Sequence, residues 1–99
     1  MINTERLVQE FIASVKIDSE TRDEGAMTQY AVSKLKELGC EVRTDDAGAK
    51  IGSNGSNIYA FYKGTLPGDP LILSAHTDTV QPGRGVEPVV EDGVIKSAG

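Results

Sequence analysis

The 99-residue sequence predicts an α/β fold in which two amino-terminal helices pack on a mixed β-sheet. Three observations lead to this prediction. Apolar residues recur with a helical period up to residue 38, and the period falls to about two after Gly39. Residues 71–75 are apolar on both faces, which is typical of a central strand covered on both sides.

The first helix is indicated by apolar residues that share one helical face. They are Leu7, Val8, Phe11, Ile12 and Val15. Asn3 or Thr4 can cap this helix, because short polar side chains accept hydrogen bonds from the first exposed amides. The polar segment 16–22 then breaks the pattern and separates the two helices.

The second helix is expected from about Arg22 to Leu38. Thr21 and Glu24 have the spacing of a capping box at its start. Gly39 stands where a left-handed residue would end it.

Strands are expected where apolar and β-branched residues alternate or cluster between turn signals. These segments are 40–44, 58–63, 71–75 and 89–96, the last as a hairpin turning at Asp92-Gly93. Only two helices are available to cover the predicted sheet. We therefore expect the chain to continue past residue 99 or to bury its open sheet face against a partner, which includes association with further copies.

Composition excludes several functional classes. The net charge of -5 leaves no basic face for nucleic acid, and the apolar stretches are far too short for a membrane helix. The amino terminus lacks the pattern of a signal peptide, so a cytoplasmic location is expected. Cys40 is the only cysteine and is expected to be a small core residue, with no intrachain disulfide.

His76, the only histidine, stands where the apolar run gives way to the polar residues 77–79. Because alternate residues of an extended chain point to the same side, His76 and Asp78 should face the same space. A backing carboxylate orients a metal-ligating histidine, so the pair suits a metal ligand or a general base. By spacing alone, a strand-end histidine satisfied by Asp78 or by backbone groups is favoured, because three-residue patterns of common types arise by chance. The chain also offers no second histidine near His76 in sequence, whereas a zinc site needs three or four ligands.

The setting of the pair strengthens the metal interpretation. Residues 74–80, Ser-Ala-His-Thr-Asp-Thr-Val after an apolar strand, resemble the first metal motif of the zinc exopeptidases that include peptidase T, carboxypeptidase G, aminoacylase and acetylornithine deacetylase. Residues 35–42, 57–60 and 63–64 fall in that family's order, and 85–95 is similar to the peptidase T-like branch. The resemblance covers essentially the whole chain.

The resemblance implies that His76 is a ligand to one zinc of a two-zinc site and that Asp78 is the catalytic-site acid that holds its ring. It also implies that the remaining metal ligands, the glutamate general base and a smaller lid domain lie beyond Gly99. Residues 1–99 are then the amino-terminal part of a single catalytic domain. The full enzyme would hydrolyse peptides of two or three residues with metal-activated water, and the fragment alone would be inactive.

Two other functions stay open. An amidohydrolase of the same family would act on N-acyl amino acids, because the His-x-Asp motif is shared across the family. A non-catalytic assembly module would instead pair its exposed sheet with another chain. Arg84, just after the motif, would either approach a substrate carboxylate or stay solvated.

Overall fold

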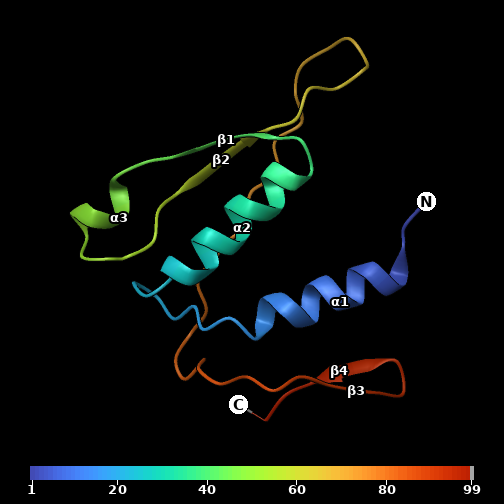
Figure 1. The fold of residues 1–99 in the computed structure, drawn as a ribbon, viewed down its shortest axis with the longest axis vertical. Coiled ribbons are helices and arrows are strands. Elements are labelled where there is room, and N and C mark those ends of the chain that lie inside the picture. Colours follow the sequence, from blue (N-terminus) through green and yellow to red (C-terminus); the bar gives the residue numbers. More distant parts are fainter. Residues whose placement is uncertain (99) are drawn as a thin grey trace.

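The computed structural model describes residues 1–98 and contains both helices and strands (Figure 1). The elements are α1 (Thr4–Val15), α2 (Gly25–Glu37), β1 (Glu41–Thr44), α3 (Ala47–Lys50), β2 (Ile58–Phe61), β3 (Val89–Glu91) and β4 (Val94–Lys96). The predicted α/β class, with two amino-terminal helices before the strands, is confirmed. No helix in residues 1–98 is long and apolar enough to cross a membrane.

Helix α1 follows its local sequence signals. The side chain of Asn3 accepts a hydrogen bond from the Arg6 amide at 3.1 Å, so Asn3 is the amino-terminal cap. Tyr30 and Lys34 of α2 reach across to Glu10 of α1, with the Tyr30 hydroxyl 2.7 Å and the Lys34 ammonium 3.1 Å from its carboxylate. These polar contacts join the two helices.

Helix α2 begins three residues later than predicted. Arg22 has a φ of 74°, which is left-handed and cannot start an α-helix. The predicted capping box is therefore wrong, and the Gly25 amide donates instead to the side-chain oxygen of Asn54 at 2.8 Å. The predicted end of α2 is confirmed, since Gly39 has a φ of 87° and the Cys40 amide bonds back to the Leu35 carbonyl at 3.0 Å.

The strands form two separate antiparallel sheets, where the sequence suggested one mixed sheet. Strands β1 and β2 pair from Glu41↔Phe61 to Thr44↔Ile58, and α2 packs against both of them and runs beside the pair in Figure 1. The short helix α3, which the sequence reasoning missed, lies in their connection.

Strands β3 and β4 form the predicted hairpin. Asp92 and Gly93 have φ values of 49° and 73°, as a two-residue turn of this kind requires. In Figure 1 the hairpin lies at the opposite end of the molecule from β1 and β2.

Residues 71–75 differ most from their prediction, because they are not in a strand. A central strand needs a hydrogen-bonded neighbour on each side, and no described residue pairs with this segment. Leu71, Ile72 and Leu73 consequently stay 84–88% exposed.

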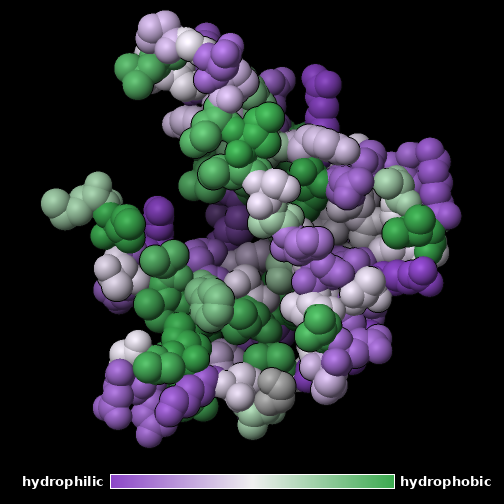
Figure 2. Space-filling model, turned by 180° about the vertical axis from the view of Figure 1, so that it is seen from behind, coloured by the Kyte–Doolittle hydropathy of each residue, from purple (hydrophilic) through white to green (hydrophobic). Residues whose placement is uncertain are grey.

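Hydrophobic side chains are not enclosed in this structure. Among residues 1–98 no hydrophobic residue is buried, and Figure 2 shows apolar side chains gathered in open patches on one face. Cys40 is only half-buried, so its expected place in a core is not found. The buried polar residues Ser19 and Glu20 instead mark the segment that touches the predicted site.

Candidate metal-binding site

His76 and Asp78 lie beside each other, as the two-residue spacing predicts. The Nδ1 atom of His76 is 3.3 Å from Oδ1 of Asp78. The imidazole is 93% exposed, whereas the side chain of Asp78 is only 29% exposed. A carboxylate on Nδ1 leaves Nε2, the outer ring nitrogen, to face a ligand.

The segment after α1 holds this motif by hydrogen bonds from residues almost sixty positions away. The Ser19 hydroxyl donates to the Thr77 carbonyl, and the Thr79 amide donates to the Ser19 carbonyl at 2.7 Å. Glu20 and Thr79 thereby form an isolated parallel bridge. Thr77 and Thr79 thus contribute backbone contacts that fix the direction of the chain on either side of Asp78.

Thr21 is the residue of this segment that touches the site directly. Its hydroxyl donates to Oδ2 of Asp78 at 2.8 Å. This hydrogen bond, followed by the charge of His76, holds the pKa of the Asp78 carboxyl below its usual value, while desolvation opposes both. Asp78 is therefore held in the charged form that can accept from an imidazole N–H.

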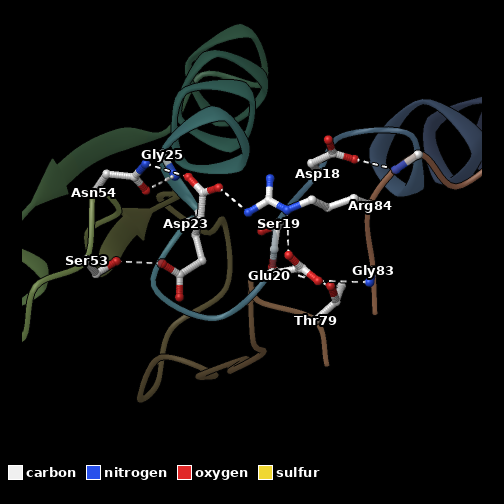
Figure 3. Close-up of polar contacts among 12 residues, drawn as sticks. Asp18, Ser19, Glu20, Asp23, Gly25, Ser53, Asn54, Thr79, Gly83 and Arg84 are labelled. Carbon is white, nitrogen blue, oxygen red and sulfur yellow. Dashed lines mark hydrogen bonds and ion pairs between the residues drawn. The ribbon is translucent and has the colours of Figure 1, made fainter. Parts of the chain in front are cut away.

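Arg84 fastens the loop after the motif to the same segment (Figure 3). Its guanidinium lies between two carboxylates, with Nε 2.6 Å from Glu20 and Nη2 in contact with Asp23. The Gly83 amide also donates to Glu20 at 3.1 Å, and the Gly85 amide donates to Asp18 at 2.8 Å. Both charged faces of Arg84 are thus committed within the chain, which favours a structural role over contact with a substrate carboxylate.

The pair opens onto a hollow of about 650 Å³. One side is formed by residues 74–78, and the other by α3, the loop that follows it and the start of β2. Thr21 and Glu24 lie along its wall. The Glu24 carboxylate is occupied by the Ser53 hydroxyl at 2.6 Å, which holds the pKa of that carboxyl below its usual value despite partial desolvation.

The donor set fits one ligand of a metal site. An exposed imidazole with a carboxylate on Nδ1 is the arrangement that metal-binding histidines commonly have. Among residues 1–98, however, no three His, Cys, Asp or Glu side chains come together as a metal site requires. Any metal held by His76 needs further ligands from elsewhere.

Sequence reasoning found His76 and Asp78 but missed Thr21. The Thr-x-x-Glu spacing of Thr21 and Glu24 pointed to helix capping, which the structure replaces with a bond to Asp78. No local pattern could have revealed this contact, because its partners are 57 residues apart.

Comparison with known proteins identifies relatives of this chain. No protein-family model matches the chain. The curated protein YqjE of Bacillus subtilis (strain 168), described as uncharacterized, is 40% identical to it over 99 residues, which is all of this chain and 27% of the relative.

Two solved structures resemble the whole chain closely. A tripeptidase from Staphylococcus aureus subsp. aureus Mu50 matches with a TM-score of 0.92 and 36% identity over 98% of this chain. Aminopeptidase PepT from Bacillus cereus ATCC 10987 matches with a TM-score of 0.79 and 39% identity over 97% of this chain. The chain spans about a quarter of the length of each of these three relatives.

The chain therefore has the fold of part of a peptidase domain. Within that class its structural neighbours are a tripeptidase and PepT, so the resemblance to peptidase T-like peptidases that the sequence predicts is confirmed.

Proposed function

We propose that residues 1–99 are the amino-terminal part of the catalytic domain of a zinc-dependent exopeptidase that hydrolyses peptides of two or three residues. The observation that carries the proposal is the His76–Asp78 pair, placed at an open hollow in a fold that superimposes on a tripeptidase. The length of the relatives leaves ample chain for the remaining metal ligands.

In this proposal His76 binds metal through Nε2, and Asp78 holds the ring from Nδ1. The Asp78 carboxylate fixes the tautomer and orientation of the ring and raises the basicity of Nε2. Zinc, when bound, supplies a Lewis acid for the scissile carbonyl and lowers the pKa of a bound water. The general base and the other ligands are expected outside residues 1–99, so the isolated chain should be inactive.

Kinetics and metal content of the whole protein test this proposal together. We expect His76→Ala to lose one of two bound zinc ions and at least about a thousandfold in kcat/KM on a tripeptide. Asp78→Asn should keep the fold but lose about 10- to 100-fold in zinc affinity or activity, because the amide cannot carry the negative charge that supports the imidazole.

A matched control and a substrate panel sharpen this test. Asp69→Asn changes an exposed aspartate in the preceding loop and should leave both zinc content and activity unchanged. Full zinc content and activity in His76→Ala would contradict the proposal. Efficient hydrolysis of N-acyl amino acids with no tripeptide turnover would identify the protein as an amidohydrolase instead. Absence of both activities in a zinc-loaded protein would favour an assembly module.

The proposal also covers the cellular location and the binding partners of the protein. We place it in the cytoplasm, and we propose that the exposed sheet surface associates with the rest of the protein or with a further copy. Nucleic acid is not expected as a partner because of the net charge of -5, and a membrane is not expected because the apolar stretches are short.

A further inference from the structure

We propose that Thr21 is a positioning residue for the metal-binding histidine, acting through Asp78 in a chain of contacts from the Thr21 hydroxyl to the Asp78 carboxylate and on to the His76 imidazole. The inference deepens the proposed function and rests on it. It assigns a role to a residue whose capping function the structure removes.

The two oxygens of Asp78 have different partners. Oδ2 accepts the Thr21 hydroxyl at 2.8 Å, and Oδ1 faces Nδ1 of His76 at 3.3 Å. A carboxylate that is held at one oxygen cannot rotate about its last side-chain bond without losing that hydrogen bond. The Thr21 hydroxyl therefore fixes the plane in which Oδ1 meets the imidazole.

Thr21 is itself held in place from both sides. Its amide donates to the Thr79 carbonyl at 3.3 Å, directly after Asp78 in the chain. Its segment is also tied to the loop that follows the motif, through the Arg84 contacts with Glu20 and Asp23. Because the segment that carries Thr21 is fixed, its hydroxyl can hold the carboxylate in one orientation. A hydroxyl on a mobile segment would instead move together with the carboxylate.

The hydrogen bond from Thr21 matters because few contacts hold the His76 side chain itself. The imidazole is 93% exposed, so packing does not select its rotamer. Asp78 is 29% exposed and accepts the Thr21 hydroxyl, so the orientation of the ring can be set through this carboxylate. A charge-assisted hydrogen bond from Thr21 to Asp78 is strong enough for that purpose.

The test compares Thr21→Val with Thr21→Ser in the whole protein. Valine matches the shape of threonine but has no hydroxyl, whereas serine keeps the hydroxyl and loses a methyl group. We expect Thr21→Val to weaken zinc affinity about fivefold in competition with a chelator, less than the loss for a direct partner of the ligand. Thr21→Ser should stay within about twofold of the parent protein, as should the control Thr65→Val, which changes a threonine in an exposed loop.

A double-mutant cycle shows whether Thr21 acts through Asp78. In an Asp78→Ala background, Thr21→Val should have no further effect on zinc affinity, because the side chain that accepts the Thr21 hydroxyl is gone. A full fivefold additional loss in that background would overturn the proposal. So would unchanged affinity in Thr21→Val, or an equal loss in Thr21→Val and Thr21→Ser.

Folding is checked by thermal unfolding of each metal-free variant. If Thr21→Val does not fold, Thr21→Ala takes its place, and failure of both would overturn the proposal by showing that the hydroxyl maintains the fold itself. The proposed function fails separately, when His76→Ala keeps its zinc. If His76→Ala loses zinc but Thr21→Val binds zinc with normal affinity, only the proposed role of Thr21 is contradicted.

Discussion

Arg84 shows how single residues hold the candidate site in place. It bridges Glu20, whose side chain is only 10% exposed, and Asp23, and so joins the segment after α1 to the loop after the His76 motif. The Arg84 contact is the largest cause that holds the pKa of the Asp23 carboxyl below its usual value of 3.8. Removal of the guanidinium leaves the Glu20 carboxylate largely buried beside a hydrogen-bonded amide but without its cation.

We expect Arg84→Met to lower the unfolding temperature of the whole protein by a few degrees at neutral pH, because the long apolar side chain keeps the packing but not the charge. Since the Asp23 pKa is lowered in the folded state, its stabilisation is present above pH of about 3.8 and is lost as the pH falls through the folded value. The difference between Arg84→Met and the parent protein should therefore shrink in acid.

Differential scanning calorimetry across pH measures this effect, with Lys63→Met as the control at an exposed position. Equal unfolding temperatures for Arg84→Met and the parent at neutral pH would refute the structural role of Arg84. A loss of tripeptide binding without any loss of stability would return Arg84 to the substrate-binding alternative.

Among the helices and turns, the sequence correctly predicted the features that depend only on contacts between neighbouring residues. The cap at Asn3, the left-handed Gly39 and the Asp92-Gly93 turn act within a few residues, and all three are found where the sequence places them. The start of α2 could not be predicted in this way, because its first amide is capped by Asn54 from 29 residues away.

In the candidate site too, the sequence predicts contacts between neighbouring residues but not contacts between distant ones. His76 and Asp78 are two residues apart, so the alternation of an extended chain was enough to bring them together. Thr21 reaches Asp78 only through the fold. The run 71–75 has the composition of a central strand but lacks a hydrogen-bonded neighbour among the described residues, and no reading of composition could supply one.

The connection between β1 and β2 contains a close approach that only glycine allows. A Cβ atom at Gly48 in α3 would lie 1.9 Å from the carbonyl oxygen of Gly55, which is backbone and cannot swing away. We expect Gly48→Ala to destabilise the protein by about 1–3 kcal/mol, the usual range for overpacking, as measured by urea unfolding.

Gly64→Ala is the matched control for this prediction. No atom lies within 4 Å of a Cβ placed at Gly64, so the change should stay within about 0.5 kcal/mol. Equal stabilities of the two alanine variants would show that α3 and the loop after it are not packed as the structure has them.

At the scale of the whole molecule, the hydrophobic residues among 1–98 are either exposed or half-buried. No hydrophobic residue among 1–98 is buried, and the apolar run 71–73 is open to solvent. Burial of apolar surface is the main favourable contribution to folding, so this arrangement suits a part of a larger domain whose remaining chain covers these faces. The relatives, about four times as long, have chain enough to do so.

We therefore expect the 99-residue chain, expressed alone, to melt without a cooperative transition and to bind a hydrophobic dye strongly. The whole protein should melt sharply and bind little dye under the same conditions. A sharp thermal transition for a monomeric 99-residue chain would show that it folds independently and would contradict this account.

The central claim is that His76 is a zinc ligand supported by Asp78, and anomalous X-ray scattering at the zinc edge from crystals of the whole protein tests it most directly. We predict an anomalous peak about 2.0–2.1 Å from Nε2 of His76, with Asp78 on Nδ1 of the same ring. Zinc peaks that all lie far from His76 in a catalytically active crystal would contradict the claim.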